Sequence, residues 1–210
     1  LEVREHPSQG LEKLGTFSSW TLILFGASML LNGLISIGVG VGIEIPPWLI
    51  MSGVSIFATG FASAALTALV VRHVIIPSMV DNGEDLDHMF KPHEHVMHNL
   101  ALVLLSIDLL LGGMVILWEL ISLSLIVGAL YLIFAEFWAI KGAGYYVYEF
   151  IDPRPKFAPL FLSGLLGVCL ISFCIGLAIS EIREDYPLLA AFAILLFLSF
   201  SVRFRDPSTR

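Results

Sequence analysis

Long apolar runs with almost no charge dominate this chain of 210 residues. The hydrocarbon core of a bilayer offers no partner to an exposed backbone N–H or C=O group, so an apolar run of about 20 residues is stable there only as an α-helix. Charged residues make up only 14% of the chain, against about 25% in a typical soluble domain. The sequence therefore predicts an all-α, polytopic integral membrane protein in contact with the lipid bilayer.

Polar or proline-containing breaks divide the apolar sequence into six runs. We expect three helical hairpins, with transmembrane helices at 17–42, 48–71, 98–118, 122–141, 157–180 and 187–202, flanked by polar tails at 1–16 and 203–210. The stretch from His98 to Ile140 would be about 65 Å long as one helix, roughly twice the bilayer core, so we expect it to reverse near Glu119. We expect the second helix to end before Pro77.

The basic residues test this number of spans independently. Under six spans, all of the 11 Lys and Arg residues except Arg183 fall on one side of the membrane. Basic loops remain in the cytoplasm, so we expect both termini on the cytoplasmic side of a cell membrane. A formal net charge of -7 argues against a nucleic-acid partner, because phosphates are neutralised by clustered basic residues.

Small residues indicate which helix is the most enclosed. Ser55, Thr59, Ser63 and Thr67 recur every four residues in the second apolar run. Rows of small side chains allow close approach of helix backbones, which is the main packing device inside a membrane. We therefore expect the second helix to be central.

Two acidic residues lie inside the predicted spans. Counting about 1.5 Å per residue from a turn near Glu119 places Asp108 near the middle of the bilayer and Glu136 nearer the cytoplasmic leaflet. A carboxylate at such a depth costs at least about 2.5 kcal/mol, so it must be protonated, paired or facing water. Because no Lys or Arg lies at a comparable depth, we expect a proton or cation path lined by Asp108, Glu136 and Asn32. The alternative is a protonated acid that hydrogen-bonds a neighbour such as Ser106.

Histidines are concentrated between the second and third apolar runs, at His73, His88, His93, His95 and His98. If a helix begins at Pro92, Glu94 and His98 share one face, as do His95 and His98. Imidazole and carboxylate groups bind zinc, copper and iron, so we expect a transition-metal site drawn from His73, His88, His95, His98 and Glu94. The alternatives are a haem between His73 and His98, or a solvated surface that titrates near neutral pH.

Three functions are compatible with these features. The first is a cation- or proton-linked transporter or channel. The second is a non-catalytic or metal-bearing subunit of a larger membrane complex, and either of these functions is consistent with a homo-oligomer or with other membrane subunits as partners. The third is a membrane oxidoreductase that uses a metal or haem. The sequence contains no phosphate-binding loop, nucleophile elbow or Cys-x-x-Cys motif, so we do not expect an enzyme of the soluble type.

Overall fold

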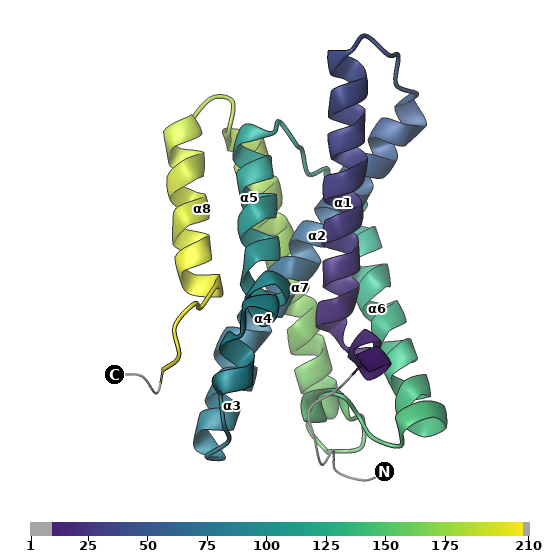
Figure 1. Ribbon diagram of the computed structural model, residues 1–210, viewed down its shortest axis with the longest axis vertical. Helices are drawn as coiled ribbons and strands as arrows, with labels where there is room; N and C mark the ends of the chain where they lie inside the picture. Colours follow the sequence, from purple (N-terminus) through teal and green to yellow (C-terminus); the bar gives the residue numbers. More distant parts are fainter. Residues whose placement is uncertain (1–9, 208–210) are drawn as a thin grey trace.

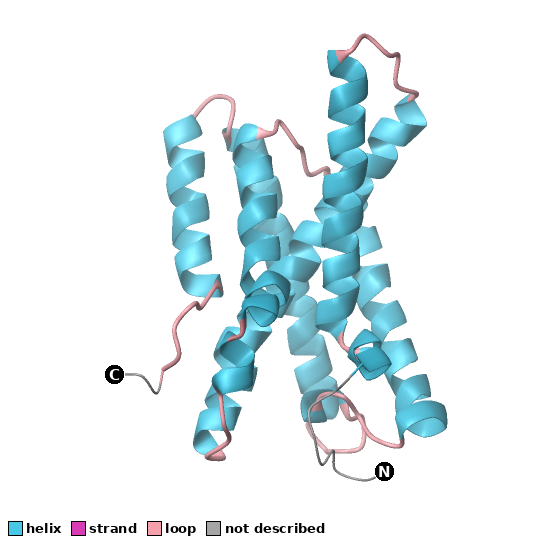
Figure 2. Cartoon of the chain, viewed as in Figure 1, coloured by secondary structure: helices cyan, strands magenta, loops and turns pink. Residues whose placement is uncertain are grey.

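Helices form nearly all of the computed structural model, which describes residues 10–207 apart from the side chains of Leu11 and Ala143 (Figures 1 and 2). The α-helices are α1 (Phe17–Gly40), α2 (Pro47–Val70), α3 (Ile76–Asp81), α4 (Pro92–His95), α5 (Ala101–Leu111), α6 (Ile121–Phe137), α7 (Ala158–Ile182) and α8 (Pro187–Ser201). The π-helical turns are η2 (Val71–Ile75), η4 (Val96–Leu100) and η6 (Trp138–Ala143). Residues 10–207 contain no strand, so the expected all-α architecture is confirmed.

Five helices in the described part of the chain are long and apolar enough to cross a membrane, at Phe17–Gly40, Pro47–Asp81, Pro92–Leu111, Trp118–Gly142 and Ala158–Ile182. The apolar helix α8 has 15 residues. At 1.5 Å per residue it is about 22 Å long, which is short of the roughly 30 Å hydrocarbon core. By length and composition, residues 10–207 thus contain five candidate spans, which is compatible with a membrane protein.

Helix α2 lies at the centre of the bundle. It runs diagonally behind α1 in Figure 1 and contacts α1, α5, α6, α7 and α8. In its helix, Pro47–Asp81, 67% of the most apolar segment is buried, compared with at most 39% in the other four candidates. Phe57 and Phe61 are fully buried, and Thr21 of α1 approaches Thr67 hydroxyl to hydroxyl at 3.0 Å. The expectation that the second helix is the most enclosed is confirmed.

The second helix does not end before Pro77, as the sequence suggested. Proline has no N–H group, so an α-helix through Pro77 would leave the carbonyl of His73 without its usual partner. The chain widens here into the π-turn η2, in which Ile76 N–H donates to the carbonyl of Val71. This wider turn accommodates the proline, and the helix continues to Asp81.

The third helix also ends at a different place from the expected one. Gly112 N–H donates to the carbonyl of Asp108 at 2.8 Å, and Gly113 has a φ of 72°, which a residue with a side chain rarely adopts. The helix therefore stops at Leu111, and the chain reverses through residues 112–117 rather than near Glu119. As a result Asp108 lies one turn from the helix end, not three turns from a later reversal.

Arg183 holds this reversal in place. Its Nη1 atom donates hydrogen bonds to the carbonyls of Leu109 at 2.6 Å and Met114 at 2.7 Å. Its side chain is only 11% exposed. The last carbonyls of a helix have no partner within the helix, so this guanidinium replaces water at the end of α5.

The C-terminal end of α8 is held in a similar way by residues of the long helix Pro47–Asp81. Arg72 donates to the carbonyls of Ser199 and Val202, and His73 Nε2 lies 2.9 Å from the carbonyl oxygen of Phe200. Nearby, Asn99 exchanges two hydrogen bonds with the backbone of Arg203, at 2.8 and 3.0 Å. Arg72 and His73 therefore have structural partners at the end of α8.

We expect Arg183→Ala to lower the unfolding free energy by about 2 kcal/mol, because it leaves the carbonyls of Leu109 and Met114 without a charged donor. Thermal unfolding in mild detergent measures the change. The matched control is Arg205→Ala, at an exposed arginine. Equal melting temperatures for the two variants would contradict the role assigned to Arg183.

Candidate functional site

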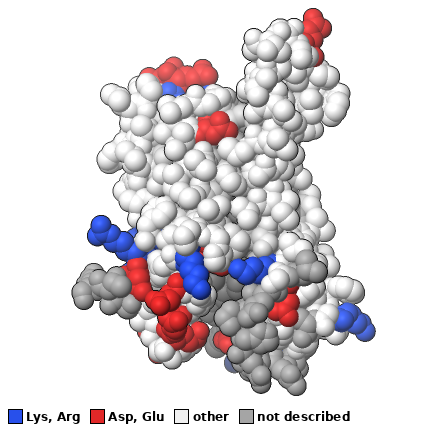
Figure 3. Space-filling model, viewed as in Figure 1, with Lys and Arg blue, Asp and Glu red and all other residues white. Residues whose placement is uncertain are grey.

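A large open cavity lies at the end of the bundle that is formed by α3, α4, η4, the residues before α1 and the 144–157 loop. It has a volume of about 1220 Å³. We call it the vestibule, and its wall includes Lys13, Met79, Glu94, Met97, His98, Tyr146, Tyr148, Arg154 and Phe161. Figure 3 shows that most of the visible Lys and Arg side chains gather at this end of the molecule. The vestibule thus combines a charged rim with apolar side chains.

Glu94 is the centre of a charged cluster in the wall of the vestibule. Its Oε1 atom lies 3.3 Å from Lys13 Nζ and 3.2 Å from His93 Nε2, and its Oε2 atom lies 3.6 Å from His98 Nε2. The Glu94 and His98 side chains are only 12% and 8% exposed. The second ring nitrogen of His98, Nδ1, is buried and has no hydrogen-bond partner among the described residues.

Local sequence explains how this cluster forms. Pro92 occupies the first turn of α4, where its missing N–H group costs nothing. Glu94 follows in the same turn, where the helix dipole favours a negative charge. The spacing from Glu94 to His98 is four residues, which places both side chains on one helix face, as the sequence predicted.

The structure does not gather the histidines of the expected metal site. His88 and His98 line the vestibule, but His73 lies against α8, with its ring stacked on Phe200 at 4.6 Å between centroids. His95 pairs with Asn99 at 3.2 Å and packs against two phenylalanine rings. Within residues 10–207, no group of three or more His, Cys, Asp and Glu side chains is arranged to hold a metal ion.

The three residues expected along one ion path lie in separate places. Asn32 joins α1 to α2, because its side-chain amide donates to Ser28 at 3.3 Å and to the carbonyl of Gly53 at 3.2 Å. Asp108 is half-buried near the end of α5. Glu136 accepts a hydrogen bond from the hydroxyl of Tyr146, at the vestibule end of α6. None of the three lines the vestibule or the inner cavity described below.

The partner of Glu136 belongs to a small network that sequence reasoning missed. The Arg154 guanidinium lies 5.6 Å from the centre of the Tyr146 ring, and its Nε atom donates to Asp152 at 2.8 Å. Burial and the hydrogen bond to Glu136 raise the pKa of Tyr146 to about 12. The hydrogen bond from Arg154 lowers the pKa of Asp152. Proximity of Asp152 to Arg154 was readable from the sequence, but the position of Tyr146 was not.

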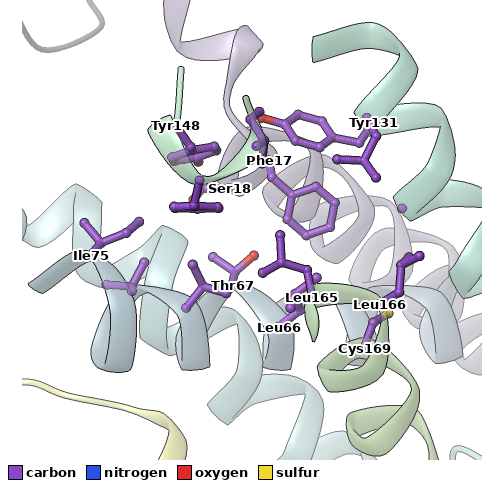
Figure 4. Close-up of a pocket in the computed structure, with 16 residues that line it drawn as sticks. Phe17, Ser18, Leu66, Thr67, Ile75, Tyr131, Tyr148, Leu165, Leu166 and Cys169 are labelled. Atoms are coloured by element: carbon purple, nitrogen blue, oxygen red, sulfur yellow. The ribbon is translucent and has the colours of Figure 1, made fainter. Parts of the chain in front are cut away.

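A second, smaller cavity lies deeper in the bundle, between α1, α2, α6 and α7 (Figure 4). We call it the inner cavity. Its volume is about 60 Å³, and its wall is almost entirely apolar, with Phe17, Leu66, Tyr131, Leu165, Leu166 and Cys169 among its residues. Ser18, Ile75, Tyr148 and Phe150 line both the inner cavity and the vestibule. The two spaces therefore adjoin, and burial raises the pKa of the Tyr148 phenol between them.

Comparisons of the chain with protein-family models, curated proteins and solved structures find no match. The candidate functional features of the structure are the Glu94 cluster, the vestibule and the inner cavity. Of the histidines and acidic residues named in the sequence analysis, His88, His93, Glu94 and His98 line the vestibule. Function is therefore inferred from this end of the bundle.

We expect Tyr146→Phe to lower the unfolding free energy by about 1 kcal/mol, because Glu136 loses a hydrogen-bond donor. Thermal unfolding near neutral pH measures the loss, with Tyr145→Phe as the matched control on the neighbouring residue. If both variants melt with the wild type, the bond between Tyr146 and Glu136 contributes nothing to stability.

Proposed function

We propose that the chain crosses the membrane six times, with both termini and the vestibule on the cytoplasmic side. Two observations support a crossing by α8. Its beginning follows Arg183, which caps the end of α5, and its last carbonyls bind Arg72 at the opposite end of the bundle. Apart from Arg183, and from Arg72 inside the helix Pro47–Asp81, the described basic residues lie near helix ends on the vestibule side, in agreement with the positive-inside rule.

We further propose that the protein is a proton- or cation-linked transporter that takes up its ion at the Glu94 cluster. The observation that carries this proposal is the side chain of His98, which is buried beside a carboxylate and lines an open vestibule. An imidazole beside a carboxylate offers groups that can hold a proton or a cation. The nearby Lys13 is a second partner of Glu94 in the same cluster.

Asp108 is the second ion-binding group in this proposal. The helix Pro92–Leu111 carries the Glu94 cluster at its beginning and Asp108 near its end. Ten residues separate His98 from Asp108, or about 15 Å along the helix axis. One continuous helix thus carries an acidic group near each of its ends. Glu136 and Asn32 have partners of their own and stand outside this path.

Proton flux into proteoliposomes tests the transport proposal. An imposed membrane potential drives uptake, and a pH-sensitive dye inside the vesicles reports it. We expect Glu94→Gln and Asp108→Asn each to reduce the flux at least tenfold, because neither amide can exchange a proton. Glu119→Gln, at an exposed turn residue, is the matched control and should leave the flux unchanged.

The same assay is repeated with Na⁺ and K⁺ gradients. If the wild-type protein carries no flux of protons, Na⁺ or K⁺, the transport proposal is wrong. Wild-type flux in both Glu94→Gln and Asp108→Asn would remove the two carboxylates from the path. Correct folding of each variant is checked by its elution from a size-exclusion column.

A second candidate function is that of a subunit in a larger membrane assembly. The connection between α1 and α2 extends beyond the ends of α5 and α8 in Figure 1. Its side chains include the exposed apolar residues Val41 and Ile43, and Trp48 in the first turn of α2 is also exposed. An apolar tip that projects past its neighbours is suited to contact with another membrane subunit or a second copy. Purification in mild detergent would separate the two functions, because a subunit is expected to retain stoichiometric partners.

A further inference from the structure

We propose that the vestibule and the inner cavity together bind one zwitterionic phospholipid from the cytoplasmic leaflet. In this arrangement the headgroup lies in the vestibule, and the end of one acyl chain enters the inner cavity. The proposal rests on a mixed polar and apolar space that adjoins an almost entirely apolar one. It is independent of ion transport, because it does not require Glu94 or Asp108 to change protonation.

The shared wall supplies the connection that such a ligand needs. Ser18 and Tyr148 provide hydroxyl groups at this boundary, and Ile75 and Phe150 provide apolar surface. In Figure 4, Ser18, Tyr148 and Ile75 lie on one side of the inner cavity, while Leu166 and Cys169 lie on the other. The wall is thus mixed where the two spaces adjoin and mainly apolar in the rest of the inner cavity, which matches the order of groups in a phospholipid.

The size of the inner cavity limits what enters it. Its volume of about 60 Å³ is less than half that of the cavity of about 150 Å³ that admits a benzene ring. A linear chain end is thinner than a ring, so the cavity favours an acyl chain over a sterol or another fused-ring lipid. The vestibule, at about 1220 Å³, exceeds the range of about 300–1,000 Å³ that is usual for ligand pockets. It has room for a headgroup and for the upper part of the chain.

The charges around the vestibule favour a headgroup with both signs. Two ion pairs lie in its wall, Lys13 with Glu94 and Arg154 with Asp152. The wall also contains Lys91, Glu84 and Glu149. A phosphate can meet the cationic side chains and an ammonium group the carboxylates, whereas a purely anionic headgroup would face four acidic residues. The buried Nδ1 atom of His98, a residue of the same wall, is an additional group that needs a polar partner.

The contribution of the acyl chain to binding can be tested at one glycine. Gly128 lines the inner cavity, and a Cβ atom there would lie 3.5 Å from Leu166, an ordinary contact. Gly128→Leu therefore fills the inner cavity without a backbone clash at the Cβ atom. Gly33→Leu is the matched control, because a Cβ atom at Gly33 of α1 meets nothing within 4 Å.

Native mass spectrometry of the full chain in mild detergent tests the proposal. The probe is a phosphoethanolamine lysophospholipid with a 16-carbon chain, compared with its phosphoglycerol analogue and with an 8-carbon chain. We expect one bound lipid per chain, at least tenfold weaker binding in Gly128→Leu, and unchanged binding in Gly33→Leu. In the wild type, the anionic analogue should bind at least tenfold more weakly, and the short chain should bind still more weakly because it cannot reach the inner cavity.

Three results would overturn the proposal. The first is binding of many lipids per chain without saturation at one lipid, which indicates an annular lipid layer. The second is equal or tighter binding of the phosphoglycerol lipid. The third is equal affinity of the 8-carbon and 16-carbon chains in the wild-type protein, a comparison that stands even if Gly128→Leu does not fold.

Discussion

The structure depends on one constraint, that backbone polar groups in an apolar environment need a partner within the protein. Helices satisfy this need along their length, but their last carbonyls remain open. Here charged and polar side chains from distant elements cover two of these ends. Arg183 of the turn after α7 binds the carbonyls of Leu109 and Met114, and Arg72 binds those of Ser199 and Val202. These contacts fix where α5 and α8 end and how they lie against their neighbours.

The same contacts separate structural residues from candidate functional ones. Arg72, His73, Asn32 and Arg183 each have a protein partner that accounts for their position. Glu94 and His98 differ from them, because they are nearly buried, face each other and also line an open vestibule. Buried titratable groups at the wall of a cavity are the usual mark of a binding or transport site. The vestibule end of the molecule is therefore the part that stability alone does not explain.

The sequence was sufficient for the helical architecture, the central helix and the pairing of Glu94 with His98, since each follows from a local pattern of apolar or polar residues. It was insufficient for the continuation past Pro77, where a π-turn absorbs the proline, and for the end of α5 at Leu111, where two glycines permit the reversal. Contacts between residues far apart in the sequence could not be predicted, for a different reason. Lys13 and Glu94 are 81 residues apart, and His73 and Phe200 are 127 residues apart. Only the packing of the helices brings such pairs together.

The central claim is that six crossings place the vestibule and both ends of the chain on the cytoplasmic side. Single cysteines introduced by Asp85→Cys, Asp185→Cys and Arg205→Cys, in a chain whose Cys169 and Cys174 are replaced by alanine, test it by labelling with a membrane-impermeant maleimide. In sealed vesicles of known orientation, the account predicts that positions 85 and 205 react from the cytoplasmic face and position 185 only from the opposite face. Reaction of positions 85 and 205 from opposite faces would mean an odd number of crossings between them and would contradict the account.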